Sequence, residues 1–205
     1  PSSTLCFRNN DLFQRSDPDN IYHQYIESNY GTSIATSSVH INLGIEDLQK
    51  LFAAIRLTRC EASIYLALSA SSPFLNGNFT GNHSQRWIQF PKTPKQVPFF
   101  KDHAQYIDWI QNNINNGNMY NIRHFWSSIR PNGPDRPNHL DRLELRICDY
   151  ISDVNLLLAI TALLELRVIF LFRNLETLDP LISSKFSMHK LKTICDQNEL
   201  EVAKE

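Results

Sequence analysis

The sequence has few cysteines and no excess of charge of one sign. Its four cysteines are scattered over 205 residues without a C-x-x-C pair, which excludes a zinc ribbon and disfavours a disulfide framework. We therefore expect reduced thiols and a cytoplasmic protein. The 20 lysines and arginines nearly balance the 21 aspartates and glutamates. A protein that binds nucleic acid through counter-ion release would be far more basic, so we expect no nucleic-acid partner.

Several catalytic motifs are also missing. The sequence contains no G-x-x-x-x-G-K-[ST] loop, no G-x-S-x-G turn and no H-E-x-x-H helix. This excludes P-loop ATPases and leaves serine hydrolases and zincins without support. The most apolar run, 154–172, is interrupted by Glu165 and Arg167, whose charges would be costly in lipid. We interpret this run as a buried core helix and expect no membrane partner.

The residues that are present indicate one folded domain of mixed helix and sheet over 1–205. A hydrophobic content of 42% and a charged content of 20% are ordinary for a globular chain. Apolar residues at helical spacing predict helices, and alternating apolar and polar residues predict strands. The expected helices are 19–30, 46–69, 99–113, 149–172 and 184–205; the expected strands are 33–43, 119–130 and 142–148, and 70–98 is expected to be a long loop. This order predicts an α+β fold with an antiparallel sheet flanked by helices.

Each expected strand has one polar face, and these faces carry the residues with the most useful chemistry. They are His40 and Asn42 in 33–43, Trp126, Ser128 and Arg130 in 119–130, and Glu144 and Arg146 in 142–148. If the three faces lie together, carboxylate and imidazole donors for Mg2+ or Mn2+ would adjoin guanidinium groups that clamp phosphate or carboxylate. Each strand taken alone also fits a half-buried strand with a solvated outer face, so spacing by itself proves no site.

Four segments resemble a known enzyme family. They are S-S-V-H-I-N-L-G (37–44), A-L-S-A-S-S-P-F-L-N-G (67–77), S-I-R-P (128–131) and L-E-L-R-I-C-D (143–149). In this order, over 33–172, they are similar to the carboxylate–amine ligases of the glutamate–cysteine ligase group, and most of all to its cyanobacterial members. The resemblance implies a glutamine-synthetase-like fold, in which helices flank a curved antiparallel sheet.

The resemblance also implies a reaction, its cofactors and its site residues. ATP, with Mg2+ or Mn2+, would phosphorylate the γ-carboxylate of L-glutamate, and the amine of L-cysteine would displace the acyl phosphate, in the first step of glutathione synthesis. By position, His40 and Glu144 would bind the metal, and Arg130 and Arg146 would lie near the phosphates or the glutamate carboxylate. The expected substrate-binding residues are Asn42, Ser72, Asn76 and Arg86.

One departure from the family concerns the remaining metal ligands. The family has a Glu-x-Glu arrangement on strands nearer the N-terminus, whereas Glu27 is the only glutamate before Glu46 here. Together with the start at Pro1, this predicts that the chain is the C-terminal portion of a longer enzyme and is inactive alone. Two alternatives stay open: a related ligase with another amine substrate, and a non-catalytic binding or structural domain on the same scaffold. The oligomeric state is not predicted.

Overall fold

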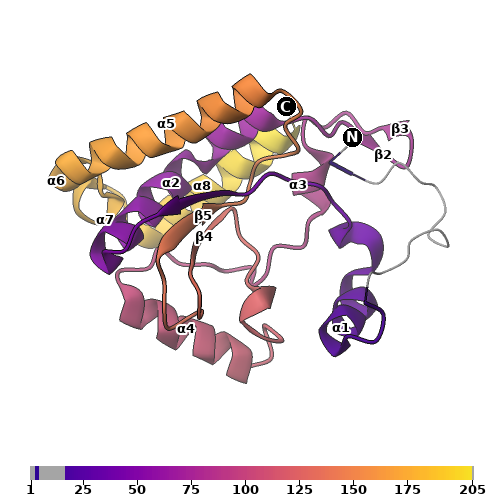
Figure 1. Cartoon of the computed structure of the whole chain (residues 1–205), viewed down its shortest axis with the longest axis horizontal. Helices are drawn as coiled ribbons and strands as arrows, with labels where there is room; N and C mark the ends of the chain where they lie inside the picture. The colour runs from indigo at the N-terminus through magenta and orange to yellow at the C-terminus, as the bar shows by residue number, and fades with distance from the viewer. Residues whose placement is uncertain (1–2, 5–16, 205) are drawn as a thin grey trace.

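The computed structural model describes residues 3–4 and 17–204 and shows an α+β architecture (Figure 1). The strands are β1 (Ile41–Gly44), β2 (Phe74–Leu75), β3 (Asn78–Phe79), β4 (Ile129–Asn132) and β5 (Arg142–Leu145). The helices are α1 (Ile21–Tyr30), α2 (Leu48–Ser69), α3 (Gln85–Gln89), α4 (His103–Asn115), α5 (Val154–Arg173), α6 (Leu175–Leu178), α7 (Pro180–Ser183) and α8 (Met188–Lys204). Short 3-10 helices occupy Gly31–Ile34 and Ile122–His124.

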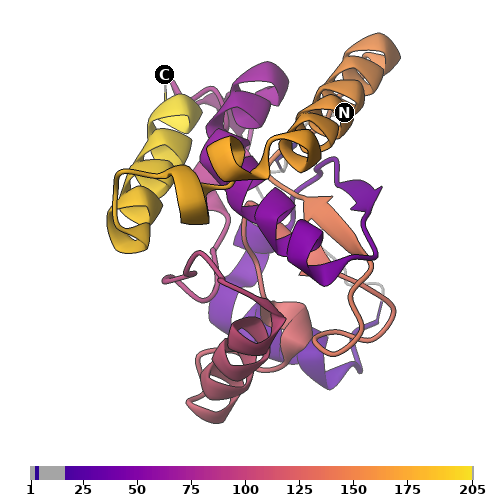
Figure 2. The same cartoon turned by 90° about the vertical axis from the view of Figure 1, so that its left-hand side faces the viewer.

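The central sheet has three antiparallel strands in the order β1-β5-β4. Residues that pair across neighbouring strands share a face of the sheet. One face is apolar, because Ile41, Leu145 and Ile129 lie side by side, as do Leu43, Leu143 and Pro131. α2 packs against β4 and β5, and α5 and α8 pack against α2. In Figure 1, and again in Figure 2, α1 and α4 lie below the sheet and α5 lies above it, and α4 also contacts α2 through Tyr106 and Phe52.

Helix α2 forms the centre of the hydrophobic core. The Asp47 carboxylate accepts a hydrogen bond from the amide of Lys50, which caps the helix and confirms its predicted start. Leu51 and Leu66 are fully buried, and each such side chain contributes about 1.5–3 kcal/mol of burial free energy. The helix buries residues around most of its circumference because the sheet lies on one side of it and α5 and α8 on the other.

Helix α5 departs from the buried core helix predicted for 154–172. Only one stripe is buried, formed by Ile160, Leu164, Val168 and Leu171. Leu158 and Leu166 are more than 60% exposed, and Arg167 forms an ion pair with Glu61 of α2. The helical assignment is confirmed, but burial of the whole run is wrong. By length and composition, α5 is the one helix in the described part of the chain that is apolar enough to cross a membrane.

Three other expectations need correction. The predicted strand 119–130 begins only at Ile129, because the side chains of Phe125 and Trp126 fill buried space and Trp126 bridges only to Thr93. The first strand is regular only from Ile41, after an isolated bridge at Ser38. The expected loop 70–98 contains the β2–β3 hairpin and α3. Asn76 and Gly77 both have positive φ, as a tight hairpin turn requires.

The cysteines in the described part of the chain are free thiols. Cys148 and Cys195 are buried, and Cys60 is partly buried. Cys6, also predicted to be a reduced thiol, lies outside the described residues.

Candidate active site

The pairing register brings the polar residues of all three strands to one face. Asn42, Glu144 and Arg130 lie side by side across β1, β5 and β4. His40 precedes Asn42 by two residues and Arg146 follows Glu144 by two, so both extend the same face. His40 is predicted to share a face with Glu144, and a distance of 3.2 Å between His40 Nδ1 and Glu144 Oε1 confirms this geometry.

Glu144 is the centre of this polar face and is only 5% exposed. Its Oε2 accepts hydrogen bonds from Arg130 Nε at 2.6 Å and Asn132 Nδ2 at 3.2 Å, and its Oε1 accepts one from Arg146 Nη1 at 2.9 Å. Burial by itself would raise the pKa of Glu144. The hydrogen bond from His40 and the charges of Arg130 and Arg146 outweigh burial and hold that pKa well below its usual range. Glu144 is therefore an ionised carboxylate at neutral pH.

The two arginines beside Glu144 are held differently. Arg130 is buried, and its Nη1 donates to the Phe125 carbonyl at 2.6 Å, so two edges of its guanidinium are engaged. Arg146 donates to Glu144 through Nη1 alone. Burial, and then repulsion from Arg130, lowers the pKa of Arg146 to about 10, so it stays charged at neutral pH. Arg130 orients the carboxylate, whereas Arg146 retains donors for an anion.

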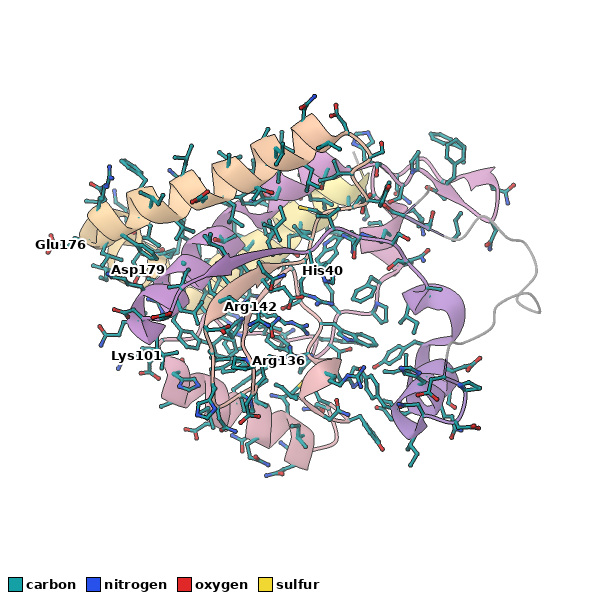
Figure 3. All side chains as sticks on the ribbon, in the orientation of Figure 1. His40, Lys101, Arg136, Arg142, Glu176 and Asp179 are labelled. Atoms are coloured by element: carbon teal, nitrogen blue, oxygen red, sulfur yellow. The ribbon has the colours of Figure 1, made fainter. Side chains whose placement is uncertain are left out.

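A third guanidinium, that of Arg136, belongs to the same group of charges. Burial, and then the charge of Arg130, lowers the Arg136 pKa, while Tyr106 and Glu144 oppose that shift. Figure 3 shows Arg136 between the sheet and α4, and the charge of Arg136 contributes to the lowered pKa of Arg146. Arg142 is partly neutralised by its neighbour Asp141, at 2.6 Å. Positive charge is therefore in excess on this face.

The pair His40 and Glu144 supplies one nitrogen and one oxygen donor for a metal once His40 Nδ1 gives up the proton that it shares with Glu144. Two ligands at right angles around an ion, each about 2.1 Å away, lie about 3.0 Å apart, which is close to the observed 3.2 Å. His40 Nε2 contacts Ser38 Oγ at 3.0 Å, which orients the ring. In the described ranges, no group of three His, Cys, Asp or Glu side chains is arranged for a metal. The pair fits Mg2+ only as part of a shell completed by phosphate oxygens, water or other protein groups.

The loop residues proposed for substrate lie elsewhere. Ser72 and Arg86 are buried, and both bind the Asp149 carboxylate: Ser72 Oγ at 2.6 Å and Arg86 Nε at 2.7 Å. Ser84 Oγ adds a third bond at 2.8 Å. This sealed cluster favours a structural role for Ser72 and Arg86. Asn76 lies at the tip of the β2–β3 hairpin, and Asn42 is exposed on the polar face.

A hollow of about 780 Å³ lies beside the edge of the sheet next to β4. Its walls include Tyr30, Trp126, Ser128, Lys92 and Glu199. Burial raises the pKa of Glu199, although the hydrogen bond with Ser128 and the charge of Lys92 oppose the shift. The volume suits a small organic ligand. The hollow lies close to the polar face, because its wall residue Ser128 is two residues from Arg130 in the chain.

Sequence reasoning missed three residues of the polar face: Asn132, Arg136 and Arg142. Extending the alternation of Ser128 and Arg130 by two residues would have found Asn132. Arg142 lies on the same face because it pairs with Asn132 across β4 and β5. Arg136 lies in the loop between these strands, where side-chain periodicity gives no information.

Comparison with known proteins decides the family. Residues 7–205 match the profile of glutamate–cysteine ligase family 2. The chain belongs to this family. A protein of Mycobacterium ulcerans (strain Agy99) named "Putative glutamate--cysteine ligase 2" is 31% identical over 149 residues, which are 72% of this chain and 37% of that protein.

Relatives of the same family give a consistent result. A relative with the same name from Mycolicibacterium paratuberculosis is 32% identical over 149 residues, 72% of this chain and 38% of its own length. One from Arthrobacter sp. (strain FB24), named as a ligase 2-1, is 32% identical over 141 residues, 68% of this chain and 36% of its own. The matched part of the chain thus spans less than two fifths of these relatives.

Proposed function

We propose that this chain forms part of an ATP-dependent ligase that joins the γ-carboxylate of L-glutamate to the amine of L-cysteine, the first step of glutathione synthesis. Membership of the family and the names of the relatives support ligase activity. The observation that carries the proposal is the polar face itself, where Arg130 and Arg146 donate to one buried, ionised carboxylate beside an imidazole and a third guanidinium, that of Arg136, adds its charge. We further propose that the sheet belongs to a glutamine-synthetase-like fold.

In the proposed reaction, an oxygen of the glutamate γ-carboxylate attacks the γ-phosphorus of ATP and ADP leaves. The cysteine nitrogen then attacks the acyl carbon, the C–O bond to phosphate breaks, and a proton is lost from nitrogen. Catalysis of phosphoryl transfer is mainly positioning and neutralisation of charge. Arg146 is suited to this task because it is charged and retains donors, and Arg130 holds Glu144 in place.

For the metal, we propose Mg2+ or Mn2+ held by His40 and Glu144 together with nucleotide phosphates. The ion would neutralise charge on the phosphoryl group as it is transferred. Glu144 and His40 each contribute one donor, and Arg130 keeps the carboxylate in a single orientation. The hollow beside Ser128 offers room for a small substrate next to this face.

We also propose that the ligase acts in the cytoplasm on small molecules, without a nucleic-acid or membrane partner. The near balance of charges and the scattered cysteines support this environment.

The test uses the full-length protein with ATP, Mg2+, L-glutamate and L-cysteine. We expect equimolar γ-glutamylcysteine, ADP and phosphate by mass spectrometry and phosphate assay, with no peptide when cysteine is omitted. A different γ-glutamyl product from a panel of amines would support the related-ligase alternative. Absence of any product with every amine would refute the ligase and support the non-catalytic scaffold.

A further inference from the structure

The backbone of the loop between β4 and β5, residues 133–141, is held by several hydrogen bonds. The His139 amide donates to the Asp135 carbonyl at 2.6 Å, and the Asp141 amide donates to the Asn132 carbonyl at 3.0 Å. His103 Nε2 on α4 donates to the Pro137 carbonyl at 2.7 Å, which ties the loop to that helix. These contacts fix the backbone on both sides of Arg136.

The guanidinium of Arg136 lacks hydrogen-bond and ion-pair partners in the described part of the chain. Its Nη1 is buried without a hydrogen-bond partner, and no carboxylate in the described ranges forms an ion pair with it. The charges of Arg130 and Arg142 repel the Arg136 guanidinium, and the charge of Glu144 only partly offsets this repulsion. An unpaired buried donor costs about 1–3 kcal/mol, and more when it is charged. Purely structural packing would not favour a guanidinium here.

The charge balance of the polar face indicates that it binds an anion. Arg130, Arg136 and Arg146 together face the single carboxylate of Glu144, a surplus of two positive charges. A phosphoryl group carries about −1.5 to −2 at pH 7, and the planar fork of arginine matches its oxygens. Arg136 stays partly exposed, so a ligand entering the face can reach its side chain.

We propose that Arg136 is an anion-binding residue of this face and contacts a phosphoryl group of the nucleotide. The negative charge of the anion would balance the excess positive charge of Arg130, Arg136 and Arg146. The loop 133–141 holds the backbone of Arg136 so that its guanidinium can reach an anion bound near Arg146. Identifying the anion as a nucleotide phosphoryl group rests on the proposed function; the excess of positive charge does not.

The experiment measures inorganic pyrophosphate binding to the 205-residue chain by calorimetry, and thermal unfolding with and without pyrophosphate. The variant is Arg136→Met, which keeps an unbranched apolar stem but removes the guanidinium and its charge. We expect affinity to fall at least about tenfold, the loss expected for a charge-assisted hydrogen bond. We also expect a higher melting temperature without ligand, because an unpaired buried charge and its repulsion are removed.

The matched control is Arg123→Met, which removes an exposed arginine stacked on Tyr22. It should change pyrophosphate affinity by less than about twofold, because exposed charges are screened by salt. Arg136→Lys keeps the charge but loses the fork, so its affinity should lie between those of the wild type and Arg136→Met.

Three results would overturn the inference: no pyrophosphate binding by the wild type at low salt, unchanged affinity in Arg136→Met, or a lower melting temperature in that variant without ligand. The full-length protein separates this inference from the proposed function. If its wild type makes no γ-glutamyl product while Arg136→Met still weakens pyrophosphate binding, the function fails and the anion site stands. If product forms but Arg136→Met binds pyrophosphate normally, the function stands and this inference fails.

Discussion

Replacement of Glu144 by glutamine tests the centre of the polar face. The carboxylate is 5% exposed and accepts hydrogen bonds from Arg130, Arg146 and Asn132. Glu144→Gln retains the shape but removes the negative charge, which leaves the Arg130 guanidinium buried without a counter-charge. Breaking a buried ion pair by removing one partner costs about 3–5 kcal/mol. Because domains are stabilised by about 5–15 kcal/mol, this loss would be a large share of the free energy of unfolding.

The effect should depend on pH with a definite sign. The folded-state pKa of Glu144 lies below its ordinary value of 4.5, so folding favours the ionised form. The stabilisation is therefore fully present above about pH 4.5 and is lost as pH falls towards the folded-state pKa. The difference between wild type and Glu144→Gln should be constant from pH 7 to about pH 5 and should shrink below that.

The assay is urea unfolding of the 205-residue chain followed by circular dichroism at several pH values between 7 and 3. The matched control is Glu201→Gln on the exposed side of α8, which should change the free energy of unfolding by less than about 0.5 kcal/mol. A Glu144→Gln variant as stable as this control at pH 7 would refute the view that the carboxylate neutralises buried arginines. A difference that grows on acidification would refute the direction of its pKa.

Three further predictions concern activity and the neighbouring cluster. The 205-residue chain alone should hydrolyse little or no ATP in response to glutamate and cysteine, since its described residues provide only a two-residue metal set; robust turnover in a coupled ADP assay would contradict this. In the full-length enzyme, Arg146→Lys should fold normally by circular dichroism yet lose about 10²–10³ in turnover, because a charged donor aimed at the transition state is lost. Near-wild-type turnover would favour a solvated arginine instead. Asp149→Asn should lower the free energy of unfolding by about 3–5 kcal/mol, because it leaves the buried Arg86 without a counter-charge. Under conditions in which the variant stays folded, its pyrophosphate affinity should equal that of the wild type. A selective loss of that affinity would link Asp149 to the site.

The sequence by itself determined which residues share a face around β1 and around β5. Side chains alternate along a strand with a period of two, so the alternation around His40 and Asn42, and around Glu144 and Arg146, predicts one polar and one apolar face without reference to other strands. Amphipathic spacing likewise located α2 and α5 to within a few residues, and the acidic Asp47 marked the start of α2.

Periodicity could not reveal how the strands pair. The neighbours Asn42, Glu144 and Arg130 are far apart in the chain, and only the register of β1, β5 and β4 places them together. Aromatic residues misled the prediction of strand 119–130, because Phe125 and Trp126 favour strands and buried loops alike.

Tertiary structure alone decided the partners of the remaining charges. Arg86 and Arg136 are both arginines in loop or short-helix regions, yet one is neutralised by buried Asp149 and the other faces like charges. The exposure of α5 is a similar case, since composition reports how apolar a helix is but not which side another helix covers. Local pattern determines the direction of a side chain within its own element, whereas its charge balance and burial depend on segments that only folding brings into contact.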